Sequence, residues 1–477
     1  MLGGIRDCKT RRSSRNRPLY RHDGADFLEL TRADQRAAKP SHVGFGYYST
    51  GKELVDSPGD WGTCPNVPAL STALHESSQS DIAIAGAGAV GLASALALAK
   101  QGYRITLIDP DQEQPVLPAP YDLRTYALTP ASMRFFERLG VANWFDRERL
   151  EAFQGMRVWD GNSAGSLEFS AAALGRECLG YIIEDSNLRR ALHTAVERCD
   201  SIIRRYDAVT DVKIADANVE LMFGEPHTSI RSRLLLGCDG AKSHVRSLLG
   251  IEAQRTEYTQ HSLVCNVEVE QVHDSVARQR FLRDGPVAFL PLPDKRSCAV
   301  VWSTSPEQAS MALNAPAVDF EQLLGSAFAN TLGRVTLRSE RAVVPLQKLH
   351  TAKYVTGRSV LLGDAAHVVH PLAGQGLNLG LMDAAALAEC LGPRDKLNLE
   401  FPRSALRRFE RMRRGENLAM LSLTDQLNRL FRDNNPLVES IRAAGMVGVS
   451  RFWPLKTWLM LRAMGDVGDV PALAARG

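Results

Sequence analysis

The sequence lacks the cysteine spacings that build metal centres and disulfide frameworks. None of its eight cysteines forms a C-x-x-C pair: they are Cys8, Cys64, Cys178, Cys199, Cys238, Cys265, Cys298 and Cys390. Zinc sites need closely paired thiolates or imidazoles, and small secreted domains need a regular set of cysteines. We therefore expect no metal site, and reduced thiols that are mostly buried as small hydrophobic side chains.

A strong net charge and a long uninterrupted apolar segment are also absent. The 57 Lys and Arg residues nearly balance the 54 Asp and Glu residues, so a net charge of +3 does not predict nucleic-acid binding. The one candidate for a membrane span, residues 82–99, contains three glycines and directly follows Asp81, which favours another interpretation. The N-terminus has no apolar segment of the secretory type. Over 477 residues, 44% hydrophobic, we expect a cytoplasmic protein of two or three domains.

Residues 1–80 differ in composition from the rest of the chain. They are rich in Arg, Ser, Gly, Pro and Asp, and they show no helical or strand periodicity. Arginines cluster over residues 11–17, but the many acidic residues that follow are unlike those of a transit peptide. We interpret this segment as a disordered extension or as the product of a start site assigned too far upstream.

Residues 81–108 have the pattern of a β-α-β unit with a glycine-rich turn. The turn reads Gly86-Ala-Gly88-Ala-Val-Gly91, between a predicted strand over 81–85 and a predicted helix over 89–101. In such a turn the first glycine allows a tight bend, the second lets the backbone approach a pyrophosphate, and the third lets helix and strand pack closely. Asp109 ends the second strand, over 103–108, where a carboxylate can bind ribose hydroxyls. This motif predicts a dinucleotide but does not separate FAD from NAD.

Two further motifs follow buried strands. Asp239-Gly240 ends an apolar strand, and for this common turn a structural role is as well founded as a functional one. Gly363-Asp364 ends another strand, and a loop that opens a helix follows, with the residues Pro371, Gly374, Gln375, Gly376 and Asn378. A carboxylate at a strand end can bind a polyol, and loop amides at a helix start can stabilise the negative charge of a reduced flavin. A nicotinamide enzyme needs neither feature, so the third motif favours FAD.

No Ser-His-Asp arrangement and no metal-ligand spacing accompanies these motifs. His367 and His370 lie beside the flavin loop and are the candidates for proton transfer, with structural hydrogen bonding as the alternative. The catalytic residues are otherwise left open.

The remaining segments predict the other elements. Helices are expected near 130–139, 186–198 and 377–391 and from 402 onward, and strands over 233–238, 262–269, 287–291, 298–303 and 359–363. The strand-like runs between residues 260 and 345 predict a mixed sheet of their own.

Taken together, the motifs resemble those of the group A aromatic flavoprotein hydroxylases, and more closely those of the ubiquinone-biosynthesis hydroxylases among them. The segments that carry the resemblance are 122–128, 179–184, 279–286, 363–380, 428–431 and 454–456. It extends over about residues 81–465 and excludes the first 80 residues.

The resemblance implies a role for each motif. Gly86, Gly88 and Gly91 would hold the FAD pyrophosphate and Asp109 the adenosine ribose. Arg124 would lie beside the pyrophosphate or the ribityl chain, and Asp239 and Gly240 near the pyrophosphate or the path of NAD(P)H. Gly363 and Asp364 would meet the ribityl chain, and the loop from Pro371 to Asn378 would line the isoalloxazine.

The resemblance also implies the fold and the reaction. A Rossmann-like FAD domain of the glutathione-reductase type would be assembled from about 81–150, 180–255 and 345–400. A substrate-binding sheet over 151–179 and 256–344 would be inserted in it, and helices would fill 401–477. NAD(P)H would reduce FAD, and O₂ would supply the oxygen that hydroxylates a prenylated aromatic ring. Contacts with other ubiquinone-biosynthesis proteins are also implied.

The C-terminal segment over 451–462 is basic and rich in Trp and aliphatic residues. Peripheral contact with the inner membrane is one interpretation, and a helix packed in the core is the other. The arginines over 403–414 are expected to form a solvated helix face.

Three other functions stay open at this point. The chain could be another flavoenzyme, such as an oxidase or a prenyl reductase; a halogenase is disfavoured because W-x-W-x-I-P is absent. It could be an NAD-dependent dehydrogenase, or a flavin-binding assembly protein without turnover. The ring position, the choice between NADH and NADPH, and the oligomeric state are not predicted.

Overall fold

The structure of the protein is a computed structural model that describes residues 80–112, 115–163, 165–224, 228–394, 403–433 and 435–476. All described residues lie in the unit that spans residues 60–477. The expectation for residues 1–80 therefore falls outside the described residues, except for Ser80, which begins the first strand.

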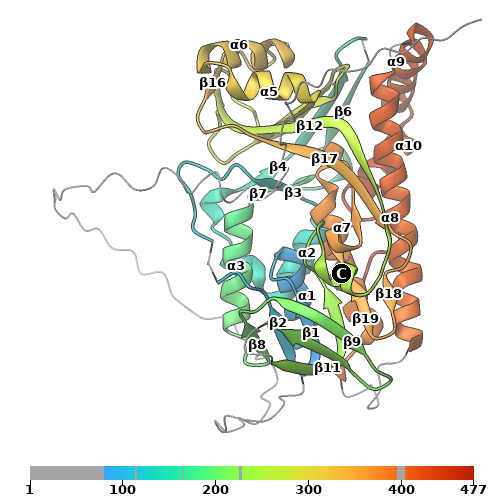
Figure 1. The fold of residues 1–477 in the computed structure, drawn as a ribbon. Helices are drawn as coiled ribbons and strands as arrows, with labels where there is room; N and C mark the ends of the chain where they lie inside the picture. The colour runs from blue at the N-terminus through green and yellow to red at the C-terminus, as the bar shows by residue number, and fades with distance from the viewer. Residues whose placement is uncertain are drawn as a thin grey trace, which may run out of the picture. The chain divides into compact units, whose positions relative to one another are not determined.

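A first sheet, at the bottom of Figure 1, is built around the predicted β-α-β unit. Its strands are β1 (Ser80–Ala85), β2 (Ile105–Ile108), β8 (Ile202–Arg205), β9 (Val209–Ile214), β10 (Val219–Phe223), β11 (Ser229–Gly237), β18 (Val355–Thr356) and β19 (Ser359–Leu361). β1 lies between β11 and β2, and β19 and β8 continue this parallel arrangement on either side. A parallel sheet with helices on its faces needs continuous apolar strands, and every residue of β1 and β2 is buried.

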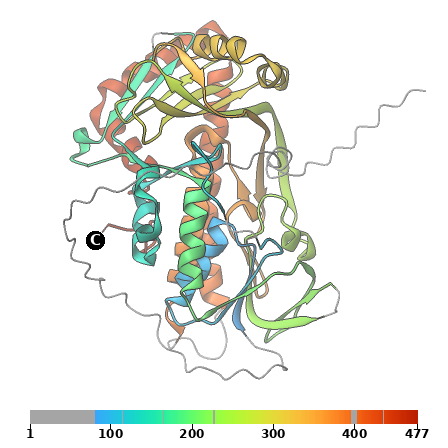
Figure 2. The same cartoon turned by 90° about the vertical axis from the view of Figure 1, so that its left-hand side faces the viewer.

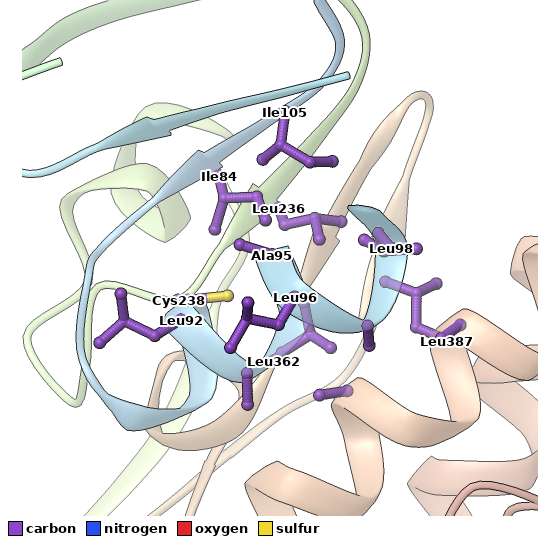
Figure 3. Close-up of a cluster of buried hydrophobic side chains, with 14 of the residues drawn as sticks. Ile84, Leu92, Ala95, Leu96, Leu98, Ile105, Leu236, Cys238, Leu362 and Leu387 are labelled. Carbon is purple, nitrogen blue, oxygen red and sulfur yellow. The ribbon is translucent and has the colours of Figure 1, made fainter. Parts of the chain in front are cut away.

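The core of this half lies around α1 (Ala89–Ala99), which packs against α7 (Gln375–Leu391) and α3 (Asp185–Glu197). Alanine and leucine fill α1, and nine of its eleven residues are buried. Figure 3 shows Ile84 and Leu236 of the sheet on one side of α1 and Leu387 of α7 on the other. Small side chains let the helix lie close to both neighbours, so the first glycine turn is held on a rigid support.

A second, mixed sheet lies at the top of Figure 1. Its strands are β5 (Gly155–Asp160), β6 (Ser166–Ser170), β12 (Ala253–Val269), β13 (Val276–Phe281), β14 (Pro286–Pro291), β15 (Ser297–Thr304), β16 (Val335–Leu337), β17 (Ala342–Thr351) and β20 (His367–Val368). The pairing is antiparallel except between β13 and β5. α5 (Pro306–Asn314) and α6 (Ala317–Ala327) cover one face, where Trp302 and Phe328 are buried together. Figure 2 shows both helices above the sheet from a second side.

A small third sheet joins these two halves. It consists of β3 (Thr125–Leu128), β7 (Gly180–Glu184) and β4 (Leu150–Phe153). α2 (Pro130–Leu139) follows β3 and begins where the Thr129 hydroxyl accepts a hydrogen bond from Ser132 N, with Pro130 at the first helical position. α4 (His244–Leu248) follows β11.

The C-terminal region is helical, as predicted. α8 (Arg403–Arg432), α9 (Pro436–Arg451) and α10 (Trp453–Ala463) run along one side of Figure 1, in orange to red. α8 packs against α7, and α9 packs against β6 of the second sheet. No helix in the described part of the chain combines the length and the apolar character that a membrane span needs.

The predicted fold class is confirmed: a parallel α/β sheet with a glycine turn, an inserted mixed sheet and a helical C-terminal region. The predicted elements are present; the helix over 130–139 has the predicted ends, and other ends shift by up to nine residues, as at β12, which begins at Ala253. The predicted domain limits stay a prediction. The six cysteines among the described residues are free, and five of them are buried, as expected; Cys8 and Cys64 lie outside the described residues.

Candidate active site

The three glycines of the first turn have different surroundings. At Gly86, φ is +103°, and a Cβ atom would lie 2.4 Å from the carbonyl oxygen of Cys238. At Gly91, a Cβ atom would lie 1.9 Å from the carbonyl oxygen of Gly86. At Gly88, no heavy atom of the described residues, its two chain neighbours aside, lies within 4 Å of the Cβ position. The protein itself therefore requires glycine at the first and third positions, whereas the space at Gly88 suits a ligand that approaches the backbone, which is the fit that a pyrophosphate needs.

Asp109 is joined directly to this turn. Its Oδ2 atom accepts a hydrogen bond from Ala87 N at 2.5 Å, and its Oδ1 atom accepts one from Asp111 N at 2.9 Å. The carboxylate thus lies at the end of β2, beside the amide that follows Gly86. This is the place in which a ribose-binding carboxylate is expected.

The third motif packs on the first through one side chain. Val90, in the first turn of α1, lies 3.2 Å from the Cβ position of Gly363 and 2.7 Å from that of Gly380. A larger residue at either glycine would meet Val90, so the Gly363-Asp364 turn and the start of α7 are held against the first glycine turn.

The second motif closes the same region from β11. Cys238 N donates to Ala85 O at 2.7 Å, which fixes the end of β11 beside the first turn. The Asp239 carboxylate accepts from Ser243 Oγ at 2.5 Å and from Val245 N at 2.9 Å, so it holds the start of α4, whose N-cap is Ser243. Gly240 has φ +79° with open space at its Cβ position. The structural role considered for this turn is thus present, and a ligand role for Asp239 stays a prediction.

Arg246, which follows the second motif, connects it to the third. The buried guanidinium donates to the carbonyl oxygens of Ala365 and Ala241 at 2.9 and 3.0 Å. Burial lowers the pKa of Arg246. A guanidinium held this way fixes the backbone just after Asp364, so the three motifs converge although they are far apart in the chain.

Arg124 and Asp364 shift each other's pKa at the place where the three motifs meet. Tyr126 contributes most to the raised pKa of Arg124, with further contributions from Asp185 and Asp364 that outweigh the opposing effect of desolvation. Desolvation raises the pKa of the Asp364 carboxyl, while His367 and Arg124 lower it. Both side chains are nevertheless exposed. A cation and a carboxylate that are open to solvent but surrounded by protein can bind a phosphate and a polyol chain.

The loop before α7 is fixed from below by Asn378. Its Oδ1 atom accepts from Thr129 N at 2.9 Å and from Ser132 Oγ at 2.7 Å. Its Nδ2 atom donates to Ala127 O at 2.9 Å and to Gly374 O at 3.0 Å. The amide is buried and uses both its donors and its acceptor within the protein. Asn378 therefore positions the loop from beneath, and its side chain is engaged away from any ligand.

The other predicted loop residues lie at the surface of this support. Pro371, Gly374, Gln375 and Gly376 are all partly exposed. Gly374 has φ +60°, and its Cβ position lies 3.4 Å from that of Ala127. The structure thus brings this loop against β3 at Ala127, the residue directly after Tyr126.

A buried charged cluster beneath the Gly363-Asp364 turn was not predicted. Asp383 of α7 accepts hydrogen bonds from four groups: Gly363 N at 3.1 Å, His367 Nε2 at 2.6 Å, Arg413 Nε at 2.8 Å and Asn417 Nδ2 at 3.0 Å. Burial alone would raise the pKa of the Asp383 carboxyl, but His367 and Arg413 outweigh it and hold the pKa well below its usual range. Asp383 thus connects the turn to α8. The signal in the sequence was an Asp inside an apolar helix, which needs a buried partner.

The geometry favours a structural role for both candidate histidines. His367 is 1% exposed and belongs to the Asp383 cluster. His370 is fully buried, its Nε2 atom lies 3.3 Å from Gln260 Oε1, and burial lowers its pKa to about 4. A buried neutral imidazole held by an amide fixes the chain before Pro371 and is not open to a substrate.

An apolar cluster adjoins the loop on the side of the second sheet. Its buried members are Phe153, Ala171, Leu179, Ile182, Ala277, Leu292, Ala299, Met460 and Met464. Tyr121 and Ala127 pack against it. Because Ala127 also contacts the loop at Gly374 and Asn378, this apolar cluster lies next to the predicted place of the isoalloxazine. Among the described residues, no group of three or more His, Cys, Asp or Glu side chains is placed to hold a metal ion.

The comparisons with known proteins agree with this site. A family model described as an FAD binding domain matches residues 79–395, which defines the class of the protein as an FAD-binding oxidoreductase. The ubiquinone hydroxylase UbiL of Rhodospirillum rubrum is 35% identical over 401 residues, which cover 83% of this chain and 92% of that protein. The 3-demethoxyubiquinol 3-hydroxylase of Escherichia coli is 32% identical over 397 residues, or 81% of this chain and 98% of that protein.

A solved structure shows the same fold. The p-nitrophenol 4-monooxygenase PnpA of Pseudomonas putida DLL-E4 superposes with a TM-score of 0.65 at 18% identity, over 81% of this chain and 98% of that one. The chain belongs to the FAD-dependent hydroxylases of ubiquinone biosynthesis. The family resemblance drawn from the motifs is thereby confirmed, and the protein is an FAD-dependent monooxygenase.

Proposed function

We propose that this protein uses NAD(P)H and O₂ to hydroxylate the aromatic ring of a prenylated phenol or quinol on the way to ubiquinone. The observation that carries the proposal is the convergence of the three glycine motifs beside the loop that opens α7, in a chain that belongs to the FAD-dependent hydroxylases of ubiquinone biosynthesis. The printed names of two relatives, a ubiquinone hydroxylase and a 3-demethoxyubiquinol 3-hydroxylase, support the same substrate class.

Different residues of the site would hold different parts of FAD. The amides around Gly86, Gly88 and Gly91 would bind the pyrophosphate, and Asp109 the adenosine ribose. Arg124 and Asp364 would hold the pyrophosphate side and the ribityl chain, with Asp239 and Gly240 close by. Bound FAD supplies the redox chemistry and the activation of oxygen.

The protein would contribute positioning, exclusion of water and stabilisation of charge. The backbone from Pro371 to Gly376, which opens α7, presents amides to a developing negative charge. The buried apolar cluster next to the loop would shield that side of the site from water. Neither step requires proton transfer by His367 or His370, whose side chains are buried.

The direct test is to identify the product. We expect the purified protein to be yellow and to consume NADH or NADPH, with a hydroxylated product formed from a short-chain prenylated phenol. Release of hydrogen peroxide as the only product would favour an oxidase, reduction of the prenyl chain a reductase, and absence of turnover an assembly role. Deletion of the gene should cause the corresponding unhydroxylated intermediate to accumulate, and that intermediate identifies the ring position.

A pair of glycine variants tests the FAD site separately from the fold. Gly88→Ala adds a methyl group into space that the protein leaves open, so we expect a stable protein that retains little FAD. Gly86→Ala places the methyl group against the Cys238 carbonyl at a positive φ, so we expect unfolding as well. Full FAD content in a folded Gly88→Ala variant would argue against a pyrophosphate at this turn.

We further infer that the C-terminal helices hold a cytoplasmic protein at the inner-membrane surface. Phe452, Trp453 and Trp458 are 59%, 48% and 47% exposed. The core-packing interpretation of this segment is therefore correct for Met460, which is 3% exposed, and wrong for the aromatic side chains. Trp side chains are typical of the interface between water and lipid.

The neighbouring helix extends the same apolar surface. The exposed residues of α9 between Leu437 and Gly448 are uncharged: Leu437, Ser440, Ile441, Ala444, Gly445, Val447 and Gly448. Arg451 is exposed between α9 and α10, where it can meet anionic headgroups. Met460 on the inner face of α10 and Met464 at its C-cap belong to the apolar cluster, so one helix would connect the lipid surface to the core beside the flavin loop.

Flotation with liposomes tests this contact. Trp453→Ser combined with Trp458→Ser should abolish binding to anionic liposomes and leave the fold intact. Met311→Ser combined with Val318→Ser removes comparably exposed side chains from α5 and α6 and serves as the control. Equal flotation of both double variants would refute the contact, and binding to zwitterionic liposomes alone would refute the role of Arg451.

A further inference from the structure

The last described residues of the chain fold back onto α2 after α10 ends. Residues 464–476, which we call the C-terminal strap, contact α2 near both of its ends. At the start of α2, Ala131 N donates to Met464 O at 3.3 Å, and toward its other end Arg138 Nη2 donates to Ala475 O at 2.8 Å. The amides in the first turn of a helix have no partner within the helix, so the strap supplies an acceptor that α2 itself lacks.

Asp466 joins the strap to two different parts of the molecule. Its Oδ1 atom accepts from Arg134 Nη2 of α2 at 2.6 Å, and its Oδ2 atom accepts from Arg176 Nη2, in the segment before β7, at 2.8 Å. The Asp466 side chain is 4% exposed. Because this carboxylate is largely shielded from water, its two charge-assisted hydrogen bonds are stronger than those of an exposed ion pair.

The strap lies directly on the first turn of α2. Gly465 has φ +72°, and a Cβ atom there would lie 2.8 Å from the Cβ atom of Ala131. Further along the strap, Ala474 is 0% exposed and belongs to the core around α1, and its carbonyl oxygen accepts from Arg134 Nε at 2.8 Å. The strap is therefore packed as part of the fold, and its position and that of α2 depend on each other.

The first turn of α2 in turn supports the flavin loop. Thr129 N and Ser132 Oγ donate to Asn378 Oδ1. Asn378 Nδ2 then donates to Gly374 O within the loop. Ala131, which donates to the strap, lies between Thr129 and Ser132 in the chain. A displacement of this turn would therefore be passed to the flavin loop through the side chain of Asn378.

A cavity of about 70 Å³ lies between the strap and the flavin loop. Gln375 and Asn378 line it on the side of the loop, and the strap lines it with Gly465, Val467, Asp469, Val470 and Pro471. A cavity of this size has room for no more than a few water molecules. The strap thus forms one wall of the space beneath the loop, and a displaced strap would admit more water there.

We propose that Asp466 is a positioning residue of the flavin site. It holds the strap against α2, and α2 with Asn378 holds the loop from Pro371 to Gly376. The proposal rests on the proposed function, because it places the flavin against this loop. Asp466 acts on the reaction only through the groups that it holds in place.

The expected consequence is a change in the product of oxygen consumption. In hydroxylation, NAD(P)H, a proton and O₂ convert a ring C–H group to C–OH, with release of NAD(P)⁺ and water. Without oxygen transfer to the ring, the same three reactants give NAD(P)⁺ and hydrogen peroxide. A site that is closed to water and correctly arranged suppresses this side reaction, so loss of Asp466 should favour it.

Asp466→Ala and Asp81→Ala form a matched pair of variants. The Asp81 side chain is 3% exposed and is paired with Arg104 and Arg394. It lies near the start of β1, whereas the first glycine turn follows the end of that strand. Each variant leaves two arginines without their carboxylate, so both should unfold at a lower urea concentration than the wild type, and only Asp466→Ala should change the flavin site.

Two measurements on the full-length, FAD-loaded protein compare these variants. Quenching of flavin fluorescence by iodide reports the access of solvent to the bound cofactor without turnover, and it should increase in Asp466→Ala alone. The yield of hydroxylated product per NAD(P)H oxidised, with a short-chain prenylated phenol, should fall by about tenfold in the same variant, since a displacement of about 1 Å can cost about a hundredfold in rate. Hydrogen peroxide should account for the difference.

Two milder variants test the route through α2 and serve if Asp466→Ala does not fold. Arg134→Gln breaks the links of the strap to this side chain of α2 and should give both changes, whereas Arg176→Gln breaks only the other link of Asp466 and should give neither. Equal changes in Arg134→Gln and Arg176→Gln would overturn this route.

The outcomes separate this inference from the proposed function. Equal iodide quenching in Asp466→Ala and Asp81→Ala would overturn the positioning role, even if the wild type hydroxylates its substrate. Absence of hydroxylated product from the wild type would overturn the proposed function, and the quenching comparison would still decide whether Asp466 positions the flavin loop.

Discussion

Charged side chains are usually exposed and large hydrophobic ones buried. The region beneath the turn that carries Asp364 breaks the first rule, and the surface of the C-terminal helices breaks the second. Beneath the turn, Asp383 and Arg413 are buried charges at 0% and 3% exposure. On the C-terminal helices, more than half of the exposed large hydrophobic side chains of the described residues are gathered: Leu418, Leu423, Leu430, Leu437, Ile441, Val447, Phe452, Trp453, Leu455 and Trp458. Buried charge and exposed apolar area are the two deviations that carry information.

The two regions differ in whether the protein itself supplies a partner for these unusual side chains. Asp383 accepts four hydrogen bonds from groups of the chain, and these offset the free energy of burying its charge. The same bonds fix the Gly363-Asp364 turn. The side chains of the C-terminal surface are left exposed by the described residues. The first region supports the candidate site, and the second is the surface for which we propose a membrane contact.

The largest expected effect is at Asp383. Replacing Asp383 with Ala leaves Arg413 buried without its carboxylate, so the free energy of unfolding should fall by about 3–5 kcal/mol. Because Gly363 N loses its acceptor as well, FAD content should also fall. Urea unfolding and the ratio of FAD to protein after dialysis measure the two effects.

A second buried pair serves as the control. Asp160 and Arg442 lie 2.8 Å apart with both side chains 1% exposed, far along the chain from the flavin turn. Asp160→Ala should cost similar stability and leave the FAD content of the folded protein unchanged. If both variants lose FAD equally, the Asp383 cluster has no special relation to the turn.

A smaller effect on the free energy of unfolding is expected from the protonation of His370 at low pH. Burial lowers the pKa of His370 to about 4 in the folded protein, against about 6.5 in an unfolded chain. Between these values the unfolded chain binds a proton that the folded chain excludes. Stability is therefore complete above about pH 6.5 and falls as the pH drops toward 4, by at most about 3 kcal/mol from this group.

Unfolding midpoints in urea between pH 7 and pH 4.5 measure this dependence. His370→Gln should reduce the slope, leaving the contributions of His193, whose pKa burial also lowers to about 4, and of His350, whose pKa burial lowers as well. The exposed His244→Gln variant should retain the full slope. A slope that is unchanged in His370→Gln would contradict the assignment.

The smallest effect is expected on the outer face of α10. Trp458→Ala should change the free energy of unfolding by no more than about 0.5 kcal/mol, because the side chain is 47% exposed. Met460→Ala, on the inner face of the same helix, should cost about 2–5 kcal/mol. Thermal unfolding compares the two, and a large loss in Trp458→Ala would mean that this ring supports the fold and is not reserved for a lipid surface.

The first β-α-β unit was predictable because its signals are local. The apolar strand, the glycine spacing and the apolar helix follow one another within residues 81–108, so no distant contact has to be known. The second sheet was predictable only as a set of strands. Its parallel pairing of β5 with β13 joins segments over 100 residues apart, and no pattern in either strand specifies it.

The arginines of α8 show the limit of predicting exposure from residue type alone. Arg403, Arg407, Arg408, Arg411 and Arg414 are exposed, as predicted for a solvated face, but Arg413 is buried against Asp383. All six have the same chemistry, and only the three-dimensional position of α7 distinguishes the one that pairs. Likewise Asn378 was predicted at the flavin loop, but its place beneath the loop depends on β3 and α2, which the local sequence does not reveal.

The contact of Val90 with Gly363 and Gly380 has a consequence for biosynthesis. At roughly 5–20 residues per second, a ribosome needs about 15 to 60 s to proceed from the first glycine turn to the segment that covers it. Until then the segment over 363–380 is not available to pack against the first glycine turn. The apolar side of α1 that α7 covers in the folded protein is exposed during that time. We therefore expect stable cofactor binding only late in synthesis, after the segment over 363–380 has packed against the first glycine turn.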